Sequence, residues 1–160
     1  MNFDLDKPFC MLDLDGVLNS ANYFQHRSDQ DDVGRPDNQI DPAAVKYLNE
    51  IADWNFVLSS TWRKFHSIDE MNKMLQSRGF KGTIIDKTPV LETPGSLRGN
   101  EIYEWIRKNI PDSWDFKNYV IFDDDSDMLY WQQNNFIHID GHFGLSPNHV
   151  YKAKRMLGIS

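Results

Sequence analysis

The chain has 160 residues, of which 40% are hydrophobic and 26% charged, a composition typical of one soluble globular domain. A formal net charge of -7 argues against coating of nucleic acid by bulk electrostatics, but it allows binding of a single phosphate or a strand end. No stretch has the length of a membrane span, and the first residues, Met1–Asp6, are acidic, unlike a signal peptide. We therefore expect a cytoplasmic protein with one domain over residues 1–160 and no membrane partner, and we leave its oligomeric state open.

A short apolar run, Phe9–Leu12, has the length of a buried strand and ends in the carboxylates Asp13 and Asp15 and in Gly16. Two carboxylates held close together repel each other, and a hard divalent cation such as Mg²⁺ would offset that repulsion. A β-hairpin is the alternative, because Asp-Gly is a strong turn signal. The polar residues after Asn19 offer no partner strand, which favours a ligand site.

Residues 20–39 are polar and show no helical period, so they predict a loop or flap lying over the end of the first strand. Asp29, Asp31 and Asp32 lie in this segment. Its length is too small for a folded lid, which predicts a minimal cap.

A helix is expected to follow, with Asp41 as its N-cap and Pro42 in its first turn. Residues 55–58 then form a second apolar strand, which ends in hydroxyl groups and a cation: Ser59, Ser60, Thr61 and Arg63. Such donors suit phosphate oxygens, although serine and threonine are also common in ordinary helix caps.

A capping box at Ser67–Glu70 predicts the next helix, which Gly79 ends. Residues 83–85 predict a strand followed by Lys87, and a helix begins near Arg98.

Another apolar strand, 119–122, ends in the acidic stretch Asp123–Asp127. These carboxylates would be costly without a cation, while the alternative is an exposed turn in which Asp125 or Ser126 caps a following helix. A last strand at 136–139 and a helix opened by Ser146-Pro147 complete the chain. The alternation of strands and helices predicts an α/β fold with a doubly wound, mainly parallel five-stranded sheet, in which the Asp13 strand is central between those of Ser59 and Asp123.

These strand ends together resemble the motifs of the haloacid-dehalogenase (HAD) superfamily, most of whose members are Mg²⁺-dependent phosphatases. Residues 58–63, 98–105 and 122–128 further resemble HAD domains associated with RNA-repair proteins, which are similar to the 3′-phosphatase half of polynucleotide kinase-phosphatases. One departure is Arg98, where many HAD phosphatases have lysine. A Gly-x-x-x-x-Gly-Lys-Ser/Thr loop, which a kinase half would need, does not occur in the sequence.

The resemblance implies a role for each matching residue. Asp13 would be the nucleophile and Asp15 the general acid and base, with Ser59 binding a phosphoryl oxygen and Arg98 offsetting charge in the transition state. It also implies that Mg²⁺ is held by Asp13, by the backbone carbonyl of Asp15 and by Asp124, with Asp123 the alternative to Asp124.

The function we expect is that of a phosphomonoesterase working through an aspartyl-phosphate, with RNA or DNA 3′ ends as its phosphorylated substrates. The alternatives are a nucleotidase that acts on mononucleotides and a non-catalytic domain that binds Mg²⁺ or phosphate. Contacts with substrate are expected from the residues that follow the second and third strands: Ser60, Thr61, Arg63 and Lys87, with Lys64 and His66 adding to a basic rim.

Overall fold

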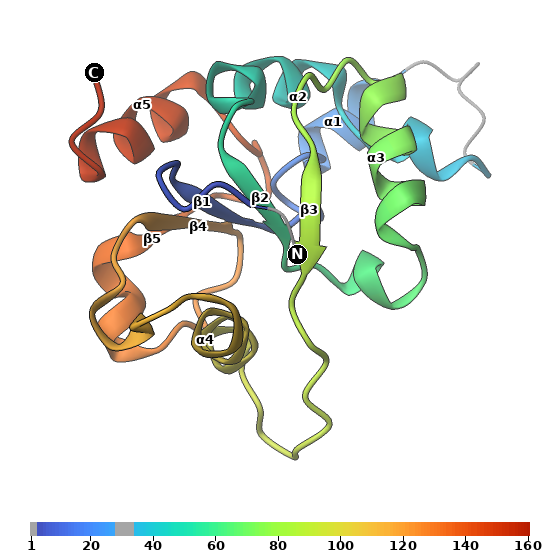
Figure 1. The fold of residues 1–160 in the computed structure, drawn as a ribbon. Helices are drawn as coiled ribbons and strands as arrows, with labels where there is room; N and C mark the ends of the chain where they lie inside the picture. Colours follow the sequence, from blue (N-terminus) through green and yellow to red (C-terminus); the bar gives the residue numbers. More distant parts are fainter. Residues whose placement is uncertain (1–2, 28–33) are drawn as a thin grey trace.

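The computed structural model describes residues 3–27 and 34–160 and shows a single parallel sheet at the centre of the molecule (Figure 1). The strands lie in the order β3-β2-β1-β4-β5. Their bounds are Phe9–Leu12 for β1, Asn55–Leu58 for β2, Ile84–Lys87 for β3, Tyr119–Asp123 for β4 and Phe136–His138 for β5. The predicted five-stranded parallel sheet is therefore confirmed, with β1 central between β2 and β4.

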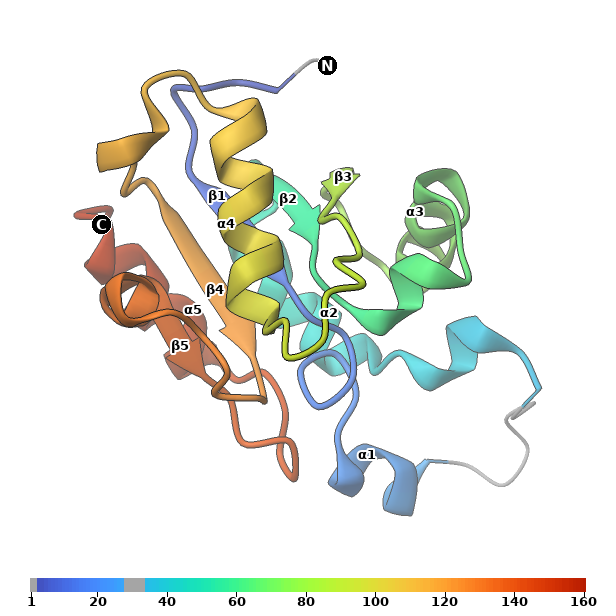
Figure 2. The same ribbon diagram turned by 90° about the horizontal axis from the view of Figure 1, so that it is seen from below.

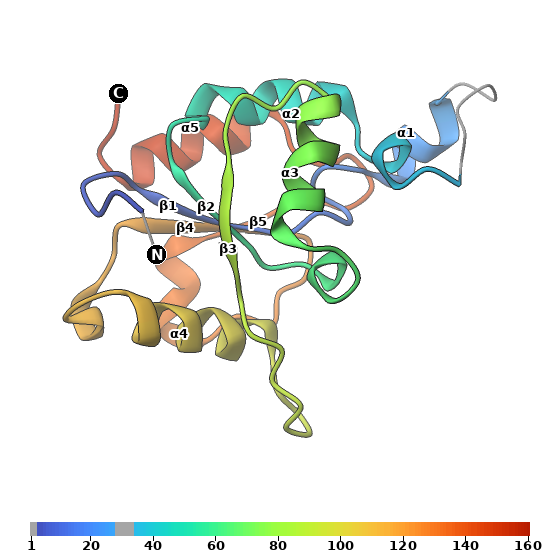
Figure 3. The same ribbon diagram turned by 45° about the vertical axis from the view of Figure 1, so that its right-hand side comes forward.

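Helices cover both faces of the sheet (Figure 3). The α-helices are α1 (Ala21–His26), α2 (Pro42–Leu48), α3 (Ile68–Ser77), α4 (Arg98–Asn109) and α5 (Pro147–Met156). Short 3₁₀ segments are η1 (Pro36–Gln39), η2 (Asn49–Ile51), η3 (Thr61–Lys64), η4 (Ser113–Asp115) and η5 (Tyr130–Asn135). Helix α4 lies on one face, whereas α2, α3 and α5 lie on the other.

Strand β1 reads as a continuous apolar run because both of its faces are buried. Cys10 and Leu12 point into the core beneath α2, α3 and α5. Phe9 and Met11 point into the core beneath α4, where they meet Trp105. Burial also raises the pKa of the Cys10 thiol well above its ordinary value, as expected for a core cysteine.

The helix boundaries follow the capping residues seen in the sequence. Asp41 accepts a hydrogen bond from the backbone N–H of Ala43 at 2.9 Å, and Ser67 accepts one from Glu70 at 3.1 Å. Gly79 has a φ of +95°, the left-handed conformation that commonly ends a helix. Strand β3 starts one residue later than predicted and runs on to Lys87.

The segment 20–39 is more ordered than the sequence predicts. The expectation of a segment without helix is wrong in part, since Ser20 caps the short helix α1 and η1 follows. The backbone N–H of Ala21 donates to the carbonyl of Gly141 at 3.1 Å, which ties α1 to the loop after β5. No residue of α1 is buried, so the apolar pattern that reveals longer helices is missing. Asp29, Asp31 and Asp32 lie outside the described residues.

The acidic stretch after β4 does not open an α-helix. The chain runs through bends and coil until η5 begins at Tyr130, so the alternative in which Asp125 or Ser126 caps a following helix is wrong. Within the described ranges, the chain forms no helix long and apolar enough to cross a membrane.

Candidate active site

The predicted site residues of β1, β2 and β4 meet at the carboxyl edge of the sheet. The backbone N–H of Asp13 donates to Phe122 at 3.0 Å, and that of Ser59 donates to Leu12 at 2.8 Å. These bonds extend the strand pairing by one residue and place Asp13 between Ser59 and Asp123. Helix α1 lies at the end of the molecule towards which β4 points (Figure 2).

Three carboxylates form an acidic cluster at this edge, defined by Asp13, Asp123 and Asp124. Each offers an oxygen, and these oxygens all lie within 4.8 Å of one another. Asp13 is 4% exposed and Asp123 only 1%, so the charges are largely withdrawn from water. Asp123 Oδ1 accepts a hydrogen bond from the backbone of Asp125, whereas its buried Oδ2 has no hydrogen-bond partner among the described residues.

Gly16 makes the close approach of Asp124 possible. Its φ of +80° lies in the left-handed region, and a Cβ at this position would overlap Asp124 Oδ2. On the opposite side, the ring Nε2 of His138 in β5 donates to the carbonyl of Asp124 at 2.7 Å. The hydrogen bond from His138 thus fixes the backbone of Asp124, while the carboxylate of Asp124 faces the turn that follows β1.

Arg98, the first residue of α4, supplies the positive charge nearest the acidic cluster. Its Nη1 lies 3.5 Å from Asp13 Oδ1 and 3.6 Å from Asp123 Oδ2, and it also donates to the carbonyl of Ser59. The backbone N–H of Arg98 donates to Asp127 Oδ2 at 2.9 Å, which anchors the start of α4. Asp127, the last of the acidic residues, therefore holds the helix that carries Arg98.

Among the described residues, the three carboxylates of the acidic cluster face a single nearby guanidinium, that of Arg98, so negative charge is in excess. Burial and the charge of Asp123 raise the pKa of Asp13 to about 9, against the opposing effect of Arg98. Burial likewise raises the pKa of Asp123 to about 6. A second positive charge would favour the ionised forms, and three carboxylates with an unsatisfied buried oxygen fit a hard, oxygen-preferring cation such as Mg²⁺.

Ser59 presents a buried hydroxyl at the same edge. Its Oγ has no hydrogen-bond partner among the described residues, although the side chain is 1% exposed. Such a group is free to donate to a ligand oxygen. Ser60 instead serves as an N-cap, since its side chain accepts from the N–H of Trp62 at 3.3 Å, and Thr61 begins η3 with an exposed side chain.

Asp15 is held by two donors that the sequence interpretation did not single out. Asn19 Nδ2 and Trp62 Nε1 each lie 3.1 Å from Asp15 Oδ1. Asn19 also accepts from the N–H of Gly16 at 2.9 Å, which closes the turn after β1. Trp62 lies 47 residues after Asp15 in the chain. The one sign of its role in the sequence was its position within the Ser59–Arg63 stretch, which was already expected to contribute to the site.

The predicted substrate contacts of Arg63 and Lys87 find no support in the geometry. Arg63 is 4% exposed and donates to three backbone carbonyls and, at 2.7 Å, to Glu101. Lys87 Nζ donates to the carbonyl of Arg63, and both residues line a hollow on the α4 side with Trp105. The sequence could not show that Arg63 turns inward, because Glu101 lies on a distant helix.

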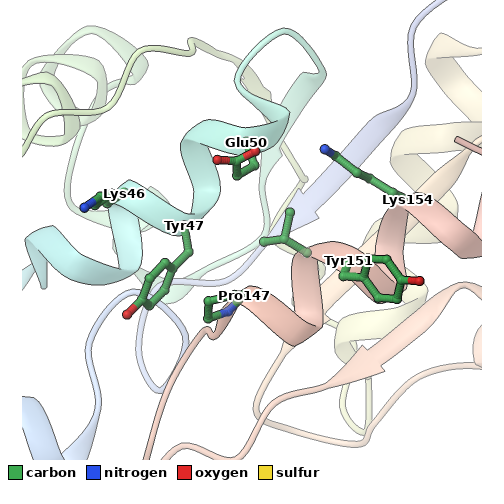
Figure 4. A pocket seen from close by; sticks show the side chains of 7 residues that line it. Lys46, Tyr47, Glu50, Pro147, Tyr151 and Lys154 are labelled. Atoms are coloured by element: carbon green, nitrogen blue, oxygen red, sulfur yellow. The ribbon is translucent and has the colours of Figure 1, made fainter. Parts of the chain in front are cut away.

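The molecule also has a hollow remote from these residues. Helices α2 and α5 border a hollow of about 310 Å³, and its lining includes Tyr47, Pro147 and Tyr151 (Figure 4). None of the residues lining it belongs to the acidic cluster or to the predicted site. A different hollow, of about 290 Å³, lies beside Asp15 and is bordered by η1 and η3.

The all-parallel sheet, with carboxylates at the ends of β1 and β4 and a hydroxyl at the end of β2, defines a HAD-like α/β domain. The family described as the HAD domain in Swiss Army Knife RNA repair proteins matches residues 9–150, and the chain belongs to this family. Membership supports a hydrolase of the HAD phosphatase class. No curated protein matches the chain.

Proposed function

We propose that this protein is a Mg²⁺-dependent phosphomonoesterase that acts through an aspartyl-phosphate on Asp13 and removes the 3′-phosphate from polynucleotide ends. The observation that carries the proposal is one juxtaposition: the acidic cluster lies beside Asp15, the free hydroxyl of Ser59 and the guanidinium of Arg98. The link of the family to RNA repair supports a polynucleotide as substrate.

The acidic cluster supplies the oxygen donors that Mg²⁺ prefers. Asp13 and Asp124 would hold the ion together with the backbone carbonyl of Asp15. Asp124 is favoured over Asp123 because its carboxylate faces the turn that carries Asp15, where a Cβ at Gly16 would overlap Asp124 Oδ2. When bound, the ion would offset the charge of the carboxylates and polarise the phosphoryl group.

The chemistry then follows from the residues around the phosphate. A carboxylate oxygen of Asp13 bonds to phosphorus while the bond from phosphorus to the leaving oxygen breaks, and Asp15 gives its proton to that oxygen. Asp15 next takes a proton from the water that attacks the aspartyl-phosphate, which releases inorganic phosphate and restores Asp13. Ser59 Oγ and Arg98 would bind the phosphoryl oxygens on which charge develops.

The way in which Asp15 is held favours catalysis over simple binding of phosphate or metal. Trp62 and Asn19 both donate to Asp15 Oδ1. Asp15 Oδ2 receives no hydrogen bond from the described residues, so it is the oxygen available for proton transfer. A domain that only bound a phosphate would have no use for a second carboxylate fixed in this way.

A polymer end is favoured over a small metabolite by the modest cover over the site. Between β1 and α2 the described residues form only α1 and η1, and no residue of either is buried. A lid that closes over a small substrate excludes water and completes specificity, and it needs more structure than these two elements provide.

The test compares kcat/KM for a 3′-phosphorylated oligonucleotide with kcat/KM for a nucleoside 3′-monophosphate, with Mg²⁺ present. We expect the oligonucleotide to be preferred, and the preference to weaken as salt rises, because contacts with neighbouring phosphates are screened. Equal efficiency on both substrates, independent of salt, would favour the nucleotidase. No phosphate release from either substrate, or release that continues in excess chelator, would contradict the proposal itself.

A further inference from the structure

The hollow beside Asp15 is lined largely by ring-bearing side chains, although it lies next to the acidic cluster. Its volume is about 290 Å³, near the lower end for small-molecule pockets at about 300 Å³. Apart from Asp15, its lining includes the ring-bearing residues Pro36, Trp62, Phe65 and His66. We call the last three the aromatic rim.

Hydrogen bonds hold the aromatic rim in a compact turn that follows β2. Ser60 caps η3, and the N–H groups of Phe65 and His66 both donate to the carbonyl of Trp62, at 3.0 and 3.1 Å. The rings of Trp62 and His66 lie 5.7 Å apart, while Phe65 leaves 77% of its surface in water. An exposed phenylalanine on a well-anchored turn is a ready surface for another ring.

The position of Asp15 indicates which part of a substrate would enter this hollow. In the proposed function, on which this inference rests, Asp15 protonates the leaving oxygen, so the leaving group must lie on the Asp15 side of the phosphate. The hollow is lined by Asp15, and the indole of Trp62 that borders it donates to Asp15 Oδ1. For a 3′-phosphorylated strand, the leaving group is the terminal nucleoside.

We propose that this hollow is the leaving-group subsite and that the base of the 3′-terminal nucleotide stacks on Phe65. Aromatic stacking suits any base, because every base has a π face, and so it recognises a nucleic acid end without reading its sequence. The subsite also gives a physical reason for an acidic protein to bind the terminal base: that contact is made by a ring and needs no cation, whereas salt-sensitive contacts would be made to the neighbouring phosphates.

The test measures kcat/KM of wild type, Phe65→Ala and Phe65→Tyr on two 3′-phosphorylated oligonucleotides that differ only in whether the last nucleotide carries a base. We expect Phe65→Ala to lower kcat/KM on the base-bearing strand by about fivefold or more, the lower end for loss of one stacked base. The loss should vanish on the abasic strand, and Phe65→Tyr should retain most of the activity. Trp114→Ala is the matched control, since Trp114 is 85% exposed in η4, before β4 begins.

Glycerol 2-phosphate, which has no ring, separates the two proposals. If wild type hydrolyses it and the oligonucleotides, but Phe65→Ala acts like wild type or loses equally on both strands, the stacking inference is overturned and the phosphatase stands. If wild type releases no phosphate from any of these substrates, the proposed function fails, and this inference fails with it.

Discussion

The acidic cluster and the aromatic rim border the same edge of the sheet, yet they are built in opposite ways. In the acidic cluster Asp13 and Asp123 are buried, at 4% and 1% exposed, and the carboxylates act on one another over a few ångströms. The aromatic rim is open at Phe65, whereas Trp62 is buried, and backbone hydrogen bonds to the carbonyl of Trp62 hold Phe65 and His66. Buried charge suits a single chemical step, whereas exposed rings can adapt to whichever base arrives.

Asp13→Asn should have the largest effect, because it removes the proposed nucleophile while almost preserving side-chain volume. We expect phosphate release to fall by more than about 10⁴-fold, the scale seen when an enzyme loses its nucleophile. Asp115→Asn is the control and should be unaffected, because Asp115 is an exposed carboxylate in η4, before β4 begins. Activity of Asp13→Asn within about tenfold of wild type would rule out an aspartyl-phosphate, since that is only about 1.4 kcal/mol of barrier.

Asp124→Ala tests which acid of the cluster holds the metal. We expect the Mg²⁺ concentration needed for half-maximal rate to rise by at least about tenfold, as happens when metal-site residues are removed. Asp123→Ala should lower the rate through Arg98 but change the Mg²⁺ requirement less. The reverse order of effects in a Mg²⁺ titration would assign the ligand role to Asp123.

Trp62→Phe tests the one contact that joins the two regions. The substitution keeps a ring in the wall of the hollow but removes the N–H that Asp15 accepts. Because a hydrogen bond to a charged group contributes about 1.5–3 kcal/mol, we expect about a tenfold loss of kcat on alkyl phosphates. Aryl phosphates, whose phenolate leaves without protonation, should lose much less. An equal loss on both substrate types would mean that Trp62 only supports the fold, and Trp131→Phe serves as the exposed control.

The smallest effect should be one of stability in the absence of metal. The pKa of Asp13 is raised from 3.8 to about 9, so the folded protein holds this proton more tightly than the unfolded chain and loses stability as pH rises between these values. In chelator, Asp13→Asn should therefore melt at a higher temperature than wild type, and the gap should widen from pH 5 to pH 8. A gain of about 1 kcal/mol would appear as about 2–4 °C.

Added Mg²⁺ should reverse this order. The ion binds the ionised carboxylates, so it should raise the melting temperature of wild type more at pH 8 than at pH 5. At either pH, it should raise the melting temperature of Asp13→Asn less than that of wild type. A gap between the two proteins that stays constant with pH would show that the buried charge of Asp13 does not limit the stability of the fold.

The acidic cluster could be predicted from the sequence because it follows from strand ends. Residues directly after parallel strands share one edge, so Asp13, Ser59 and Asp123 had to meet once the alternation of strands and helices was recognised. The outline of the site therefore needed no knowledge of how side chains pack.

The aromatic rim and the surroundings of Arg63 could not be predicted in the same way. Whether an arginine after a strand points to solvent or to Glu101 depends on how α4 packs, and the sequence carries no local sign of it. The hydrogen bond from Trp62 to Asp15 depends on the rotation of a short 3₁₀ turn. Helix α1 escaped detection because it buries no apolar face.

The burial of Cys10 has a practical consequence for measuring these effects. It is the only cysteine in the sequence, it is fully buried, and the raised pKa of its thiol disfavours the reactive thiolate. An alkylating dye should therefore leave the native protein unlabelled. A cysteine introduced at the exposed Lys64, beside Phe65, would be the one reactive thiol, and a fluorophore placed there could report the arrival of an oligonucleotide end without any change to the core.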